Sequence, residues 1–129
     1  TEQHLSSADL VLAMAREHRR AVAELVPSRT RVAFTVREFG RLASSLPDRA
    51  LRDAVDAAAD QDAAGRLRAA VAAVAGQRGL VLPPAAPADD DVVDPYRRSW
   101  STYELSAAQL DPAIDQVVRV VGLATATAA

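Results

Sequence analysis

Apolar positions in the first third of the chain follow two different periods, one typical of buried strands and one of helices. Residues 9–14 form a short apolar run, which predicts a strand buried on both faces. Residues 16–26 predict a helix, because positions suited to a buried face recur every three or four residues. These positions are His18, Ala21, Val22 and Leu25. Pro27 ends that helix, and the alternation within residues 31–35 predicts a second strand.

The next helix carries the clearest start signal in the chain. Thr35 and Glu38 have the spacing of a capping box, in which each side chain accepts a hydrogen bond from an otherwise unpaired backbone N–H. The expected buried positions are Phe39, Leu42, Ala43 and Leu46, and Pro47 stops the helix. The order strand, helix, strand, helix predicts a parallel α/β unit.

Residues 48–78 are rich in alanine and predict two further helices. Their apolar stripes are Leu51, Val55 and Ala58 in the first and Leu67, Val71 and Val74 in the second. Alanine gives strong helix propensity but little bulk for packing. We therefore expect a peripheral insertion rather than part of the main core. Residues 83–87 read as a proline-rich connector, and the aspartates at 89–91 as a solvated acidic loop.

The last helix is expected over residues 101–123. Ser101 to Glu104 match a second capping box. The predicted buried face consists of Leu110, Ile114, Val117, Val118 and Val121. Pro112 either kinks this helix or starts a new one after a cap at Asp111, and we favour one kinked helix. Trp100 is expected to cover the core beside it.

Composition narrows the class of protein. The 129 residues fit one domain, and half of them are hydrophobic. All fifteen basic residues are arginine, which is typical of a GC-rich bacterial genome, and they form no dense basic block. With a formal charge of −2, this argues against nucleic-acid binding. The chain has no apolar run of about 20 residues, no secretory signal pattern and no cysteine. We expect a cytoplasmic protein that does not bind membranes.

The run Asp91-Val92-Val93-Asp94-Pro95-Tyr96 stands shortly before the last predicted helix. Together with the apolar run that starts at Ala8, the Arg16-Glu17-His18-Arg19 segment and the order of elements, it resembles a bacterial low-molecular-weight protein-tyrosine phosphatase without its opening segment. The resemblance implies a flavodoxin-like, three-layer α/β fold with a parallel sheet. Residues 1–129 would be a single, N-terminally incomplete domain. Its parts would be a helical insertion and linker (48–87), an acid loop (88–97) and a terminal helix (101–123).

By that resemblance Asp94 is the general acid and Tyr96 an aromatic wall of the substrate pocket. Expulsion of a phenolate, whose conjugate acid has a pKa near 10, is eased by proton delivery from a positioned carboxylic acid. Pro95 would fix the backbone after the acid. The substrate of the complete enzyme would be a phosphotyrosine protein or a small aryl phosphate, and the reaction would use neither a metal nor a cofactor.

The family's nucleophile is a cysteine in a phosphate-binding loop, and this sequence has none. Alone, the chain is therefore predicted to be inactive. The first hypothesis is a fragment whose missing segment carries the nucleophile. The second is a non-catalytic interaction or structural domain. A relative acting on arsenate ranks last, because it would need redox cysteines.

The histidines and the consecutive aspartates are expected to have structural roles rather than to bind metals. His4 and His18 are too isolated in the sequence for a metal site. Consecutive aspartates at 89–91 point in different directions, so a cation site is not expected there. In the family fold a missing strand would pair with residues 9–14. We therefore expect an open sheet edge that permits self-association.

Overall fold

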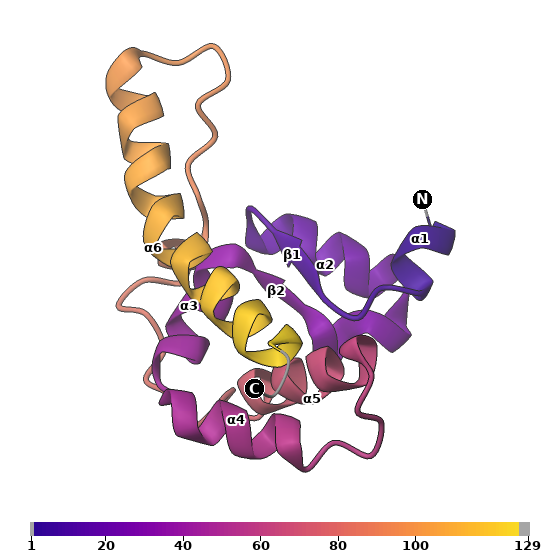
Figure 1. Cartoon of the computed structure of the whole chain (residues 1–129). Coiled ribbons are helices and arrows are strands. Elements are labelled where there is room, and N and C mark those ends of the chain that lie inside the picture. Colours follow the sequence, from indigo (N-terminus) through magenta and orange to yellow (C-terminus); the bar gives the residue numbers. More distant parts are fainter. Residues whose placement is uncertain (1, 127–129) are drawn as a thin grey trace.

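The computed structural model describes residues 2–126 and is a mixed α/β structure, mostly helical, with a two-stranded parallel sheet (Figure 1). A short helix α1 (Glu2–Ser6) precedes strand β1 (Val11–Ala13), which pairs with β2 (Ala33–Thr35). Val11 lies opposite Ala33, and Ala13 lies opposite Thr35. Within residues 2–126 no helix has the length and apolar character needed to cross a membrane.

The connection between the strands is α2 (Arg16–Leu25) followed by the 3₁₀ helix η1 (Pro27–Val32). The predicted parallel strand–helix–strand–helix unit is therefore confirmed, although both strands are shorter than expected. Residues 31–32, which were expected to start the second strand, belong to η1 instead. Within η1 the Thr30 hydroxyl donates a hydrogen bond to the Pro27 carbonyl at 2.8 Å. The predicted buried face of α2 is wrong: the helix has no fully buried residue, and Leu25 is exposed.

Helix α3 (Val36–Ser44) starts at the predicted capping box, which is confirmed in both directions. The Glu38 N–H donates to Thr35 Oγ1 at 3.0 Å, and the Thr35 N–H donates to Glu38 Oε1 at 3.1 Å. Phe39 of α3 packs edge-on against Phe34 of β2, with ring centroids 5.2 Å apart. Leu42 and Ala43 are buried as predicted, whereas Leu46 lies beyond the end of α3 and is half-buried against the core.

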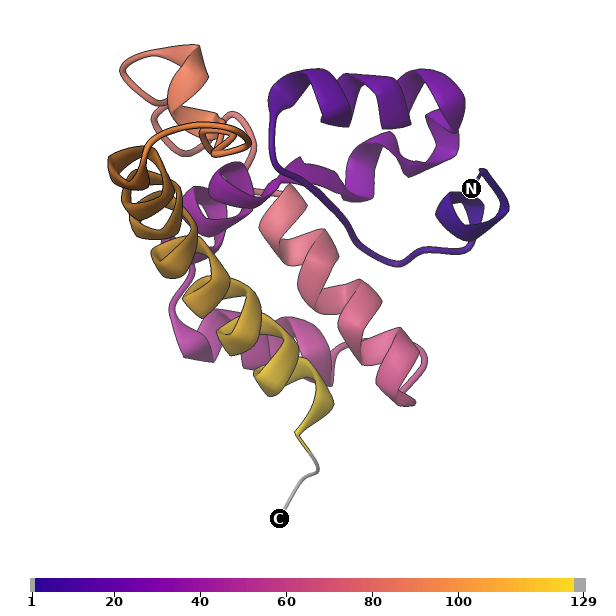
Figure 2. The same cartoon turned by 90° about the horizontal axis from the view of Figure 1, so that it is seen from above.

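Helices α4 (Asp48–Asp56) and α5 (Ala63–Ala75) belong to the main core, so the prediction of a peripheral insertion is wrong. Leu51 and Val55 of α4 and Val71 and Val74 of α5 are buried in one cluster with Phe34. Figure 2 shows α5 lying between α6 and the βαβ unit. A sheet of two short strands offers little apolar surface, and alanine-rich helices can approach closely enough to supply the rest.

Helix α6 (Trp100–Thr125) runs unbroken through Pro112, which confirms a single helix at this point. The helix begins at Trp100, before the predicted second capping box at Ser101–Glu104. That capping-box prediction is therefore wrong. Ser99 is the N-cap residue, but its side chain bonds to the hydroxyls of Ser101 and Thr102 instead of capping a backbone N–H.

The face of α6 that meets the core was predicted only in part: Leu110 and Val117 pack against the core, but the fully buried residues differ. Its buried residues are Ala113, Val120 and Ala124, whereas Ile114 and Val118 are 40% and 65% exposed. Small residues decide this orientation, because a Cβ on Gly40 of α3 would stand only 3.0 Å from the Ala113 Cα. The first half of α6 extends away from the body (Figure 1), and Trp100 is 75% exposed rather than covering core.

Gly65, near the start of α5, tests how tightly this helix is joined to the turn before it. A Cβ at Gly65 would lie 2.3 Å from the backbone oxygen of Asp60. We therefore expect Gly65→Ala to lower the free energy of unfolding by about 1 to 3 kcal/mol, despite the better helix propensity of alanine. Urea denaturation measures the change. Gly122→Ala in α6 is the matched control, since nothing lies within 4 Å of its added Cβ, and it should not destabilise the protein.

Candidate functional site

A hollow of about 550 Å³ opens where β1 ends and α2 begins. Its lining comes from the residues that follow β1, from the first turn of α2, and from the loop before α6. The lining residues are Met14, Ala15, Glu17, His18, Asp91, Val92, Val93, Asp94 and Pro95. Ligands of open parallel α/β sheets bind outside the carboxyl ends of the strands, so this hollow lies where such a fold places its chemistry.

The loop over the hollow is held by backbone and side-chain contacts to three other elements. The Val92 N–H donates to the Met14 carbonyl at 2.8 Å, and the Val93 N–H donates to Gln109 Oε1 at 2.8 Å. Arg37 Nη1 donates to the Asp91 carbonyl at 3.0 Å. Val92 is buried. The loop is thus fixed to the end of β1 on one side and to α3 and α6 on the other.

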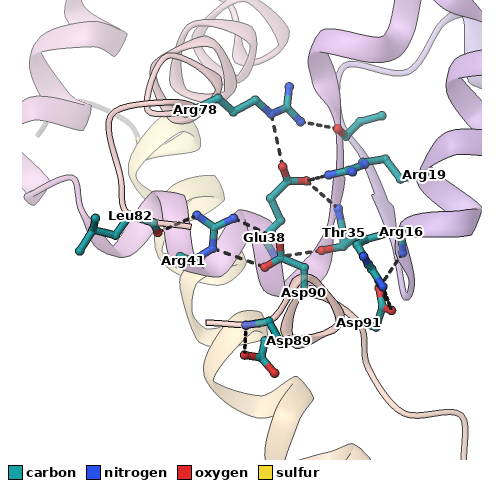
Figure 3. A network of polar contacts seen from close by, with 12 residues as sticks. Arg16, Arg19, Thr35, Glu38, Arg41, Arg78, Leu82, Asp89, Asp90 and Asp91 are labelled. Atoms are coloured by element: carbon teal, nitrogen blue, oxygen red, sulfur yellow. Dashed lines mark hydrogen bonds and ion pairs between the residues drawn. The ribbon is translucent and has the colours of Figure 1, made fainter. Parts of the chain in front are cut away.

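Asp91 joins this loop to the first residue of α2 (Figure 3). Its Oδ1 accepts from the Arg16 backbone N–H at 2.7 Å and from Arg16 Nε at 3.2 Å. Ala15, the N-cap residue of α2, cannot supply a side-chain cap, so Asp91 does so from a distant part of the chain. Burial raises the pKa of Asp91, but the Arg16 N–H and guanidinium outweigh this and hold the pKa below its ordinary value.

This contact makes stability depend on pH in a defined direction. Because the pKa of Asp91 is lowered in the folded state, its contribution is complete above the ordinary value of 3.8 and is lost as pH falls below it. We expect Asp91→Asn to lower the free energy of unfolding by about 1 to 2 kcal/mol at neutral pH. The difference in free energy of unfolding between the Asp91→Asn variant and the parent should become smaller below pH 3.8. Denaturant unfolding at neutral pH and below pH 3.8 tests this prediction. Asp115→Asn, on an exposed turn of α6, is the control.

The two preceding aspartates are also engaged, so the prediction of a solvated acidic loop is wrong. Asp90 is buried, and its Oδ2 lies 3.1 Å from Arg41 Nη2 (Figure 3). Asp89 Oδ2 accepts from the Ala86 N–H at 3.1 Å. The part of the chain that the structure describes contains no group of three His, Cys, Asp or Glu side chains placed to hold a metal ion.

Of the two residues predicted for the site, the structure brings only Asp94 to the hollow. Asp94 is exposed, and its Oδ1 accepts from the Tyr96 N–H at 2.9 Å, which closes a tight turn around Pro95. Tyr96 is 69% exposed and is not part of the lining. Its ring lies beside the guanidinium of Arg97, 5.2 Å from the ring centroid.

His18 is the lining residue whose place the sequence pattern did not reveal. Helical spacing had assigned it to the buried face of α2, yet it is exposed and borders the hollow. Its Nε2 lies 3.7 Å from Glu17 Oε1. His4, on α1, is exposed and does not line this hollow. The nearness of His18 to the end of a predicted strand was the one available signal.

The lining combines apolar walls with groups that can exchange protons. Met14, Val92 and Pro95 are apolar, whereas Asp94 and His18 can donate or accept a proton. The lining contains no cysteine, serine, threonine or lysine, so it offers carboxylates and an imidazole but no thiolate, hydroxyl or amine nucleophile. Comparison with protein-family models, with curated proteins and with solved structures gave no match to this chain.

Proposed function

We propose that this chain supplies the general acid of a phosphomonoesterase of the bacterial low-molecular-weight tyrosine phosphatase type. In this proposal β1 and β2 are part of a larger, flavodoxin-like parallel sheet in a cytoplasmic enzyme. The observation that carries the proposal is the attachment of the Asp94 loop to the end of β1 and the start of α2, through Val92 and Asp91. That attachment puts a carboxyl group beside the sheet end where parallel α/β enzymes bind substrate.

The substrate inferred is an aryl phosphate monoester, including phosphotyrosine. Cleavage of its P–O bond releases a phenolate, which takes a proton from the Asp94 carboxylic acid as it departs. The apolar wall of Met14, Val92 and Pro95 suits the aromatic ring of such a substrate. Tyr96 would have to turn toward the hollow to contribute a further wall.

In this proposal the cysteine nucleophile and the phosphate-binding groups come from outside these 129 residues, which contain no cysteine. The hollow carries the carboxylates of Glu17, Asp91 and Asp94, which repel a phosphate dianion unless positive groups or N–H donors face them. A loop that aims backbone N–H groups and an arginine at phosphate would supply both, and a cysteine in it would form a phosphocysteine intermediate.

The test is to express the reading frame that contains Thr1 together with its upstream sequence and to assay p-nitrophenyl phosphate. We expect an upstream strand followed by a cysteine, five residues and an arginine, and turnover that is lost when that cysteine is changed to serine. The polypeptide of 129 residues should show no turnover under the same conditions. Turnover by this polypeptide, or an active longer protein that tolerates the serine substitution, would contradict the proposal.

The alternative function is a non-catalytic interaction domain, and uncovered apolar surface favours it. Within the described residues β1 pairs with β2 alone, so its other edge is open, and Met14 at its end is 44% exposed. Ile114 and Val118 add an exposed apolar stripe on α6. Self-association through the β1 edge is the form we propose for this alternative. An in-frame stop codon directly upstream of Thr1, with a dimer in sedimentation equilibrium, would favour it over the enzyme.

A further inference from the structure

A second hollow, of about 450 Å³, lies against the other side of α2 from the Asp94 loop. Helical spacing separates the two, because Glu17 and His18 face one hollow, whereas Arg19, Arg20 and Ala23 face the other. The remaining lining comes from Thr30 of η1, Ala33 of β2, Glu38 of α3 and Arg78 beyond α5. This hollow plays no part in the proposed phosphatase chemistry.

Positive charge exceeds negative charge in this lining. Three arginines give +3 and the single carboxylate of Glu38 gives −1, so the net formal charge is +2. Glu38 is buried and already occupied: its Oε1 lies 2.7 Å from Arg19 Nη1, and its Oε2 lies 3.5 Å from Arg78 Nε (Figure 3). Oε1 also accepts the Thr35 N–H. The Glu38 carboxylate therefore forms ion pairs with both Arg19 and Arg78, and it forms none with Arg20.

Arg78 is a fixed positive charge at the inner end of this hollow. Its guanidinium lies over the Phe34 ring, 4.1 Å from the centroid, and donates to the carbonyls of Arg31 and Ala33. Burial lowers the pKa of Arg78, Glu38 acts in the opposite direction, and the charges of Arg19 and Arg31 lower the pKa further. Arg78 is thus a partly desolvated positive charge whose main charged partner is Glu38.

Arg20 is the free group of the three. Within the described part of the chain its guanidinium has no hydrogen bond and no ion pair, and the residue is exposed. Arginine presents its N–H donors in a planar fork that matches two oxygens of a phosphate or carboxylate. Arg19 uses one terminal nitrogen on Glu38, so its remaining donors are available beside those of Arg20.

We propose that this hollow binds a dianionic oxyanion of the phosphate type, held by Arg20 and Arg19 over the fixed charge of Arg78. A dianion would balance the net charge of the lining. Its tetrahedral oxygens can accept from the exposed fork of Arg20 and from the remaining donors of the half-buried Arg19. The site is exposed and contains one competing carboxylate, so we expect a dissociation constant of about 1 to 10 mM for inorganic phosphate.

Thermal unfolding and isothermal titration calorimetry on the intact chain test this proposal. Sodium phosphate above neutral pH should raise the melting temperature by about 4 to 8 °C at ten times its dissociation constant, relative to sodium chloride of equal ionic strength. Arg20→Ala should weaken binding about tenfold without loss of stability, because Arg20 holds nothing in the fold. Arg20→Lys should bind with intermediate affinity, since it keeps the charge and loses the fork.

Arg98→Ala is the matched control, because Arg98, before α6, is also exposed and does not line this hollow. It should bind phosphate like the parent. An equal melting shift in chloride and phosphate, or an equal loss of binding in the Arg20 and Arg98 variants, would overturn the proposal. Asp94→Asn should leave phosphate binding unchanged. Since binding needs no catalysis, this experiment can fail or succeed independently of the proposed phosphatase function.

Discussion

Replacing Glu38 by glutamine is expected to lower the free energy of unfolding by about 2 to 4 kcal/mol, the largest stability effect of any single polar substitution proposed for this chain. Glu38 is only 7% exposed, and its carboxylate accepts from Thr35 while it pairs with Arg19 and Arg78. Glutamine fills the same volume and keeps an oxygen for the Thr35 N–H. Its amide NH₂, however, replaces Oε2 and turns a donor toward Arg78 Nε, and the loss of the negative charge weakens the contact of the remaining oxygen with Arg19.

The expected loss of stability in Glu38→Gln comes from the weakened contacts with the two arginines rather than from the Thr35–Glu38 capping box. The side chains of Arg19 and Arg78 are 32% and 31% exposed, so water screens part of the lost attraction, and the effect should be smaller than for a fully buried pair. Urea denaturation monitored by circular dichroism gives the number. Glu24→Gln, on the exposed surface of α2, is the control and should change stability by less than about 0.5 kcal/mol. Equal effects of the two substitutions would show that the arginines need no partner.

The sequence predicted those parts of the fold that depend on neighbours along the chain. The Thr35–Glu38 capping box, the stop at Pro27 and the inner face of α3 depend on residues within a few positions of one another, and all three are confirmed. Where distant residues decide, the pattern failed. The rotation of α6 is set by the close approach of Gly40 to Ala113, which no periodicity within α6 can reveal. Ile114 and Val118 do form an apolar stripe on α6, but no described residue fully covers them.

The acidic loop illustrates the same limit at the candidate site. Asp90 and Asp91 read as solvated because their partners Arg41 and Arg16 lie far away in sequence. Folding brings these arginines to Asp91 and Asp90, and the resulting pairs hold the loop at the end of β1. Asp94 was placed by resemblance and does border the hollow, whereas Tyr96 does not. The Tyr96 ring instead contacts Arg97, whose backbone has a positive φ.

In the proposed complete enzyme, Asp94→Asn is expected to reduce kcat for phenyl phosphate by about 10²- to 10⁴-fold, the range typical of a lost general acid. Asparagine keeps the oxygen that accepts the Tyr96 N–H, so the turn should persist and the proton alone is removed. Stability should stay within about 0.5 kcal/mol of the parent, because Asp94 is exposed.

The leaving group distinguishes acid catalysis from a merely structural role. p-Nitrophenolate departs more readily without a proton than phenolate does, so the Asp94→Asn defect should be much smaller with p-nitrophenyl phosphate than with phenyl phosphate. A structural disturbance would slow both substrates alike. Asp115→Asn, an exposed carboxylate on α6, controls for the loss of one negative charge. If Asp94→Asn slows the two esters equally, then this carboxyl group does not protonate the leaving group, and the general acid must lie elsewhere in the hollow, where His18 is the next candidate.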